Sequence, residues 1–296
     1  MPYETLLTDL TDNIFTITIN RPDKLNALNT QMIRDFLDVF DEADANDAVR
    51  AIIITGAGRA FCAGADLSTG AKTFDREARP DRPQVPNGPD GKPDLSHENA
   101  RDGGGRMTLR IFNCRKLVIA AVNGPAVGIG VTMLLPMDAR IASTEARFGF
   151  VFSQRGIVPE AASSWFLPRL VGIAQALDWC YSGRVFGAEE ALAGKLVSRV
   201  VAPDALLPAA REIARGYIEK TAPVSVALVR QMMWRMLGAA HPMEAHRIDS
   251  RAMFHRGRSA DVKEGILSFL EKRPARFTDT VSADLPLLPW EEPGYR

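Results

Sequence analysis

Two glycine-rich turns, each preceded by a short apolar run, constrain the fold of this 296-residue chain most strongly. The run AIIITG at 51–56 leads into AFCAGADL at 60–67, and LVIAAV at 117–122 leads into NGPAVGIG at 123–130. A β-branched run that ends in glycines is typical of a buried strand followed by a sharp turn. Two such turns could direct backbone N–H groups at one oxygen and stabilise an oxyanion.

The second turn is the more informative, because a helical pattern follows it at 131–135. A helix N-terminus leaves N–H groups without partners and carries partial positive charge. The first turn, at Gly64-Ala65-Asp66, equally fits a tight turn closed by an aspartate side-chain bond. A dinucleotide-binding glycine loop does not fit, because Phe61 and Met133 occupy the positions of its third glycine.

Strand-like and helical patterns alternate along the chain, which predicts an α/β fold. An apolar face from Met32 to Phe40 predicts a helix capped by Asn29 or Thr30. We expect strands at 14–19, 51–54, 118–122 and 140–142, and a helix from about 130. Further helices are expected at 161–170, 174–182, 188–194, 206–218, 222–237 and 262–271.

Composition limits the classes of partner. The 36 acidic and 36 basic residues cancel, which gives no reason to expect nucleic acid or a membrane surface. The three cysteines and four histidines lack ligand spacing, so neither a disulfide framework nor a metal site is expected. Residues 117–137 are uncharged, but Asn123-Gly124-Pro125 would break a membrane helix there. No signal peptide pattern begins the chain, so a cytoplasmic location is expected.

Residues 68–105 differ from the rest of the chain, with five prolines between 80 and 93 and several glycines among charges. Such a segment cannot bury enough apolar area to fold alone. We expect this segment to form either a lid over the site or a disordered insertion. The end, 279–296, is expected to be a surface tail.

Several motifs together resemble the crotonase family, the enoyl-CoA hydratases and isomerases. Besides the two turns, they are NRPDKLNAL at 20–28, ARFG at 146–149, SGRVFGAEEA at 182–191, GKLV at 194–197, KEG at 263–265 and FLEKR at 269–273. The resemblance implies a crotonase-like spiral of ββα units over 1–200 and a helical C-terminal region, 201–278, for trimers or hexamers made of two trimers. It also implies a coenzyme A thioester of fatty acid metabolism as substrate, with no permanently bound cofactor.

The same resemblance assigns roles to particular residues. The two backbone N–H donors for the thioester oxygen fall on Ala65 and Ile129. The nucleotide end of coenzyme A would lie along the loops that contain Lys24, Ala27, Ala63, Asp66 and Leu67. Four more residues are expected to contact substrate: Gly128, Thr132, Phe152 and Trp165. Phe150, Phe152 and Trp165 would form an apolar wall that excludes water.

The departures from the family pattern bear on the reaction. Thr132 and Phe152 stand where a hydratase of this family has its two glutamates, and neither is a suitable base at neutral pH. Glu160, which follows Pro159, resembles the catalytic glutamate of the family's Δ3,Δ2-enoyl-CoA isomerases. A proline and an acid there also fit an ordinary helix N-terminus.

These residues favour an isomerase that shuttles a proton through Glu160 and holds an enolate at the two turns. A hydratase acting on 2-enoyl-CoA is the alternative enzyme, with water positioned by Glu160 or by the 68–105 segment. The non-enzymatic alternative is a family member that binds acyl-CoA without converting it.

Overall fold

The computed structural model describes residues 3–79, 81–290 and 293–295. Its main sheet has six strands in the order β1-β2-β3-β4-β6-β9. β1 and β2 are antiparallel, and the remaining neighbours are parallel. The strands are β1 (Leu6–Thr11), β2 (Ile14–Ile19), β3 (Ala51–Gly56), β4 (Leu117–Val122), β6 (Ala139–Ser143) and β9 (Arg199–Val201). All four strands expected from the sequence lie in this sheet.

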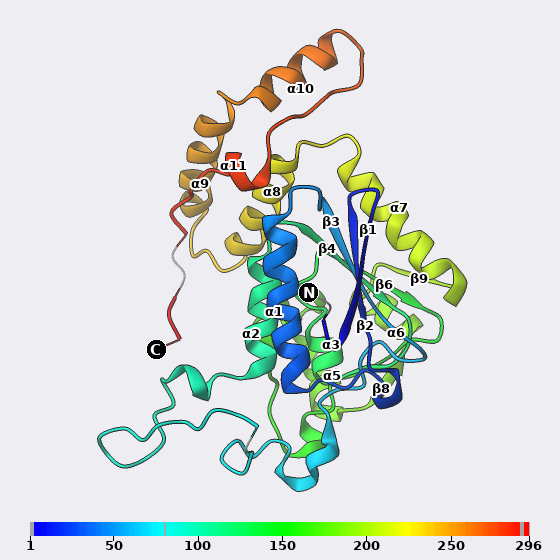
Figure 1. Ribbon diagram of the computed structural model, residues 1–296, viewed down its shortest axis with the longest axis vertical. Helices are drawn as coiled ribbons and strands as arrows, with labels where there is room; N and C mark the ends of the chain where they lie inside the picture. The colour runs from blue at the N-terminus through cyan, green and yellow to red at the C-terminus, as the bar shows by residue number, and fades with distance from the viewer. Residues whose placement is uncertain (1–2, 80, 291–292, 296) are drawn as a thin grey trace.

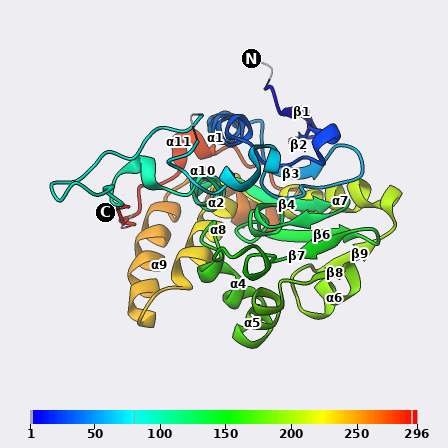
Figure 2. The same ribbon diagram turned by 90° about the horizontal axis from the view of Figure 1, so that it is seen from below.

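Helices cover both faces of the sheet (Figures 1 and 2). Ile52 and Ile54 of β3 pack in the core shared with α1 (Thr30–Ala45) and α2 (Gly103–Asn113). Ala51 and Ile53 pack on the opposite side, against α7 (Leu206–Ile218). Burial on both faces explains why these strands are continuously apolar rather than alternating.

A second, three-stranded sheet lies beyond the main one and contains β5 (Ala126–Val127), β7 (Arg147–Gly149) and β8 (Val185–Gly187). β5 is part of the second glycine turn, and the short helix α3 (Ile129–Thr132) follows it directly. The backbone N–H of Gly128 donates to the carbonyl of Gly149 in β7, over 2.9 Å. The small sheet therefore fixes the position of the second turn.

Most of the expected helices are present, with shifted ends. They are α4 (Ser163–Val171), α5 (Ile173–Ser182), α6 (Ala188–Ala193), α7, α8 (Pro223–Met236) and α10 (Ala260–Leu270). The expectation that a helix begins at 161 is wrong, because Ala161 and Ala162 have φ of 57° and 54°. Asn29 caps α1, since its side chain accepts from the N–H of Met32.

Two of the longer helices were not predicted from the sequence. α2 begins at Gly103, inside the segment interpreted as an insertion, and three successive glycines hid its helical pattern. Asp102 caps it by accepting from the N–H groups of Gly104 and Gly105. The other is α9 (Pro242–Arg256), which buries few residues and so has no strong apolar periodicity.

The part of the insertion before α2 consists of turns and two 3-10 helices, at Leu67–Lys72 and Glu98–Ala100. Figure 1 shows it as the cyan segment at the lower left. Asp81 ties it to the body by accepting a hydrogen bond from Thr30 at the start of α1. Phe74 and Arg82 of this segment line the cavity described below, and the expected lid stays a prediction.

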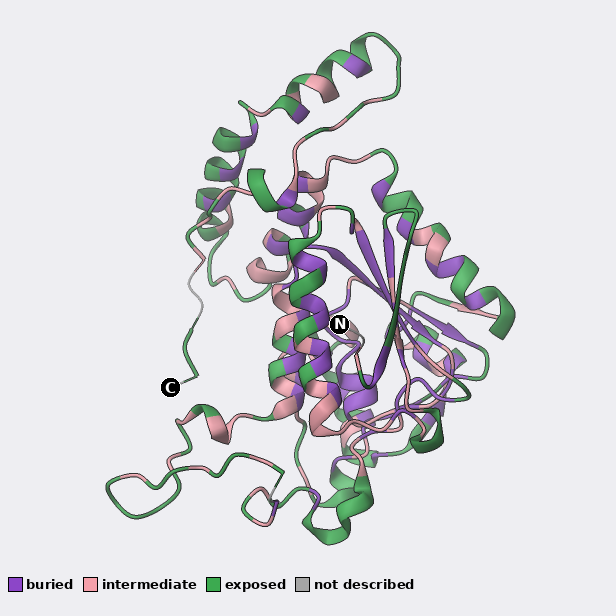
Figure 3. Cartoon of the chain, viewed as in Figure 1, coloured by how far each residue is buried: buried purple, intermediate pink, exposed green. Residues whose placement is uncertain are grey.

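The C-terminal helices α9 and α10 extend from the body and are mostly exposed (Figure 3). α10 exposes apolar side chains, among them Phe269 at 81% and Leu270 at 68%. The expected trimer or hexamer stays a prediction. In the tail, Asp279 accepts a hydrogen bond from Arg256 and Val281 is buried in α11 (Val281–Asp284), so this portion packs rather than trailing along the surface.

Across the described residues, no helix is long and apolar enough to cross a membrane. The uncharged stretch 117–137 instead forms β4, the second turn with β5, and α3.

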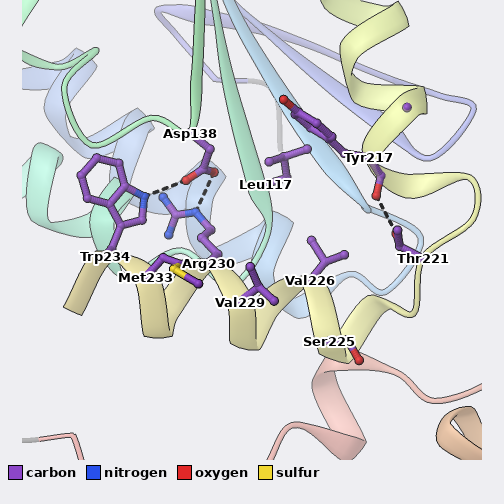
Figure 4. Close-up of a pocket in the computed structure, with 11 residues that line it drawn as sticks. Leu117, Asp138, Tyr217, Thr221, Ser225, Val226, Val229, Arg230, Met233 and Trp234 are labelled. Atoms are coloured by element: carbon purple, nitrogen blue, oxygen red, sulfur yellow. Dashed lines mark hydrogen bonds and ion pairs between the residues drawn. The ribbon is translucent and has the colours of Figure 1, made fainter. Parts of the chain in front are cut away.

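A buried charge pair joins α8 to the sheet (Figure 4). Asp138 accepts from Nε of Arg230 at 2.8 Å, from Nε1 of Trp234 at 2.8 Å and from the N–H of Val118 at 2.7 Å. The Arg230 guanidinium also donates to the carbonyls of Ile111, Phe112, Cys114 and Pro136. Both charges are therefore compensated on several sides.

Replacing Arg230 by methionine should lower the free energy of unfolding by about 3–5 kcal/mol, because Asp138 is left as a buried charge without its cation. Urea denaturation measures this loss. Arg184→Met is the matched control, since Arg184 pairs with Asp178 and Glu190 at the exposed surface. It should cost much less than Arg230→Met, because exposed ion pairs contribute little to stability. Equal losses in the two variants would contradict the structural role of Arg230.

Candidate active site

The two glycine turns lie side by side and are hydrogen-bonded to each other. The N–H of Cys62 donates to the carbonyl of Pro125 over 3.0 Å, and the N–H of Val127 donates to the carbonyl of Cys62 over 3.0 Å. These bonds form a parallel bridge between Cys62 and Ala126. The juxtaposition predicted from the sequence is therefore present.

Glycine is required where the turns touch. A Cβ on Gly130 would lie 2.0 Å from the carbonyl oxygen of Cys62, and one on Gly124 would lie 2.1 Å from that of Arg59. Gly64 and Gly128 also have positive φ, at 109° and 55°. Side chains at these positions would separate the turns or strain the backbone.

The NRPDKLNAL motif supports the first turn from behind. The buried Asn26 donates through its amide to the carbonyls of Ala57 and Ala60, and its Oδ1 accepts from the N–H of Arg21. The N–H of Leu28 donates to the carbonyl of Gly64. The motif therefore contributes to the shape of the turn.

The N–H groups of Ala65 and Ile129 take part in no hydrogen bond within the described residues. Both residues line a cavity of about 340 Å³, together with Gly128 and Glu160. Ile129 is the first residue of α3, where no intrahelical acceptor exists for its N–H. The N–H groups of Ala65 and Ile129 and the carboxyl group of Glu160 therefore surround one cavity.

Glu160 lies in the loop before α4 and points into this cavity. Its Oε1 accepts a hydrogen bond from Oγ1 of Thr132 over 2.6 Å, while Oε2 has no hydrogen bond within the described residues. Burial and the negative charge of Asp102 raise the pKa of Glu160 to about 8, against the opposing effect of the Thr132 hydrogen bond. A carboxyl group of this kind can change protonation state near neutral pH.

Asp102 is a functional residue that the sequence analysis missed. Its Oδ2 accepts from the N–H of Ala161 over 2.9 Å as well as from that of Gly105, so it joins the start of α2 to the Glu160 loop. The signal available in the sequence was an aspartate immediately before a glycine run, which is typical of a helix cap. Because residues 68–105 were interpreted as one insertion, that signal went unused.

The loop at Glu160 is held in an unusual conformation. Ala161 and Ala162 are both left-handed, which costs non-glycine residues energy, and Oγ1 of Thr108 donates to the carbonyl of Ala161. A Cβ on Gly104 would lie 2.4 Å from Oε2 of Glu160, so only glycine leaves room for the carboxylate. Residues of α2 therefore determine where Glu160 lies.

Of the expected apolar wall, Phe152 lines the cavity, but Phe150 and Trp165 do not. Phe150 stacks on Trp179 with ring centroids 5.9 Å apart. Trp165 packs against Phe166 at 4.8 Å, because the late start of α4 turns it toward the α2–α8 contact. The apolar lining comes instead from other residues, namely Leu28, Ile33, Leu67, Phe74, Val127, Val151, Ile157 and Val158.

The remaining predicted contacts are distributed around the first turn. Ala63 and Leu67 line the cavity, whereas the exposed Lys24 and the partly buried Ala27 lie outside its lining. Asp66 pairs with Arg21 at 2.8 Å and accepts from the N–H of Ser68, as expected of a turn aspartate. Thr132 touches Glu160 from beneath the cavity rather than lining it.

A cysteine nucleophile, a metal site and a site in another cavity are less well supported by the structure. Cys62 is buried, and burial raises the pKa of its thiol to about 12, so the thiolate needed of a nucleophile is disfavoured. No cluster of three or more potential metal ligands occurs among the described residues. A larger cavity of about 590 Å³ between α7 and α8 contains Asp138, but that carboxylate is already bonded to Arg230 and Trp234 (Figure 4).

Comparison with known proteins agrees with this fold. Residues 9–85 and 95–280 match the family model described as "Enoyl-CoA hydratase/isomerase". The chain is 41% identical to the enoyl-CoA hydratase ACTT3 of Alternaria alternata, over 91% of this chain and 84% of that protein. It is 32% identical to the 1,2-epoxyphenylacetyl-CoA isomerase of Escherichia coli K12, over 93% and 98%.

A solved structure supports the same conclusion. The probable enoyl-CoA hydratase/isomerase from Mycobacterium abscessus aligns with a TM-score of 0.79 and 29% identity, covering 92% of this chain and 98% of that one. The crotonase-like α/β fold expected from the sequence motifs is thereby confirmed. On its sequence, its fold and the arrangement of its two glycine turns, the chain belongs to the enoyl-CoA hydratase/isomerase family.

Proposed function

We propose that this protein is a Δ3,Δ2-enoyl-CoA isomerase in which Glu160 moves the proton. The observation that carries the proposal is the pairing of one available carboxyl oxygen with two unpartnered backbone donors around one cavity. Asp102, the other acid in the lining, has both oxygens bonded to backbone N–H groups. Glu160 is therefore the acid that is free to exchange a proton with a substrate.

The reaction needs one base and one place for negative charge. The Glu160 carboxylate removes a proton from the carbon alpha to the thioester carbonyl, and the electron pair moves onto the thioester oxygen. The N–H groups of Ala65 and Ile129 stabilise that enolate, and losing one such donor typically costs about 100-fold or more in rate. Protonated Glu160 then returns the proton to the gamma carbon, which moves the double bond from position 3 to position 2.

The lining of the cavity favours isomerisation over hydration. Phe152 occupies the position of a hydratase glutamate and cannot activate water. Thr132 stands at the position of the other hydratase glutamate. Its hydroxyl group donates a hydrogen bond to Glu160 and is therefore not free to donate to water. Since the surrounding side chains are mostly apolar, water has few polar groups to bind beside the substrate.

Hydration of 2-enoyl-CoA is the second candidate, because a relative such as ACTT3 of Alternaria alternata is named as a hydratase. Glu160 would then deliver water to the double bond, with Asp102 near it as a second acid. Binding of acyl-CoA without conversion is the third. The two substrates, 3-enoyl-CoA and 2-enoyl-CoA, separate these candidates because each reaction consumes a different one.

Replacing Glu160 by glutamine should lower kcat for the conversion of 3-enoyl-CoA to 2-enoyl-CoA by at least about 1,000-fold, because the amide cannot accept the alpha proton. Absorbance of the conjugated thioester product measures the rate. Glu145→Gln serves as the control, since Glu145 is outside the cavity lining. Rapid hydration of 2-enoyl-CoA that persists in Glu160→Gln would contradict the proposal.

The rate should also depend on pH in a way that reports on Glu160. Because the base must be ionised and its pKa is raised to about 8, kcat/KM should increase with pH and level off above about 8. Thr132→Val removes a hydrogen bond that favours the ionised form, so the rise should move to higher pH.

Thr132→Ser keeps the hydroxyl and should leave the pH profile in place. A purely structural role for Thr132 would instead lower the rate of Thr132→Val equally at every pH, without moving the profile. Measuring kcat/KM from pH 6 to 10 for the three proteins distinguishes these results.

A further inference from the structure

Arg82 is a charged residue in the cavity lining that the proposed reaction does not use. It belongs to the 68–105 segment, and it lines the same cavity as Glu160, Ala65 and Ile129. Its guanidinium is half-buried and forms no hydrogen bond or ion pair within the described residues. A cation in this environment lacks full hydration and has no hydrogen-bonded counter-ion.

The carboxylates near Arg82 are already engaged elsewhere. Asp81 forms a bidentate ion pair with Arg79 and also accepts from Thr30. Glu98 pairs with Arg101 at 3.0 Å. Asp102 accepts backbone N–H bonds with both oxygens. The protein therefore provides no direct partner for Arg82 among these acids.

A second cavity, of about 260 Å³, adjoins the active-site cavity at Arg82. Ile33 and Gly103 also line both spaces. Four more arginines line the second cavity, and Glu98 is its one acid within the described residues; the arginines are Arg34, Arg76, Arg101 and Arg106. Burial and repulsion from Arg79 and Arg76 lower the pKa of Arg82, against the opposing attraction of Asp81 and Asp102.

We propose that the acyl group of the substrate carries a carboxylate, and that Arg82 binds this carboxylate where the two cavities meet. The inference rests on the proposed function, since it concerns the acyl part of the thioester that Glu160 would deprotonate. A guanidinium presents two parallel N–H groups to a carboxylate, which suits a planar anion better than a lysine would. The neighbouring arginines add attraction for the same charge.

This arrangement makes Arg82 a determinant of substrate specificity. A neutral acyl chain of equal length would leave the guanidinium half-buried and unpaired, whereas a carboxylated chain would neutralise it. Sites that bind a charged group through hydrogen bonds reject analogues lacking that group more strongly than apolar pockets reject a missing methylene. We expect an affinity difference of roughly 10- to 100-fold between such a pair of ligands.

The phosphates of coenzyme A are the other source of negative charge near Arg82. Arg82 also lines a third cavity, beside Arg21, Ser68 and Arg79 on the side of the first turn. A phosphate contact would depend on the coenzyme A moiety alone and would be the same for every acyl group. Free coenzyme A therefore distinguishes the two anions.

The test uses isothermal titration calorimetry with two saturated acyl-CoA thioesters of equal chain length, one ending in a methyl group and one in a carboxylate. Saturated chains are not isomerised, so binding is measured whether or not the proposed reaction is correct. Wild-type protein should bind the carboxylated thioester at least about 10-fold more tightly. Arg82→Met should abolish this preference while changing the Kd of the neutral thioester and of free coenzyme A less than about 2-fold.

Arg34→Met is the control, because Arg34 is exposed and lines the second cavity but not the active-site cavity. It should keep most of the preference. Equal affinity of wild-type protein for the two thioesters would overturn the proposal. So would an equal loss of affinity for both thioesters and for free coenzyme A in Arg82→Met, which would assign Arg82 to a phosphate.

Discussion

The close backbone contact between the two glycine turns is the constraint on which the rest of the site depends. Two hydrogen bonds join Cys62 to Pro125 and Val127, and glycines at 124 and 130 allow the backbones to approach. The same contact directs the second turn into α3, so that Ile129 begins a helix with its N–H unpaired. Because backbone atoms provide these donors, side-chain variation around them leaves the two donors in place.

The groups that set the pKa of Glu160 also hold or adjoin the loop in which it lies. Asp102 caps α2, accepts from the N–H of Ala161 and raises the pKa of Glu160 by its charge. Thr132, on the helix that follows the second turn, acts in the opposite direction through its hydrogen bond. The start of α2, the loop at 160–162 and the second turn are therefore one connected unit. The family shows that an acyl-CoA enzyme is expected here, and these local contacts are what favour isomerisation.

Local pattern was sufficient to predict four of the six strands of the main sheet, a helix cap at Asn29 or Thr30 and the two turns, since each depends on neighbouring residues. The strands β1 and β9 were not predicted. The start of α4 was expected at residue 161 and lies at Ser163, because Ala161 and Ala162 are left-handed. Hydrogen bonds with Asp102 and Thr108 hold these two residues in that conformation. For the same reason Trp165 was placed wrongly in the cavity. Asp102 and Arg82 could not be found by spacing, because chain folding alone brings the 68–105 segment beside Glu160.

The central claim is that this cavity moves a proton within the substrate and does not add water to it. Incubation with 2-enoyl-CoA and with 3-enoyl-CoA in ¹⁸O-labelled water, followed by mass spectrometry of the products, tests it most directly. The proposed proton transfer should interconvert the two enoyl thioesters with no ¹⁸O in either. Accumulation of ¹⁸O-labelled 3-hydroxyacyl-CoA at a rate equal to or above that of isomerisation would contradict it.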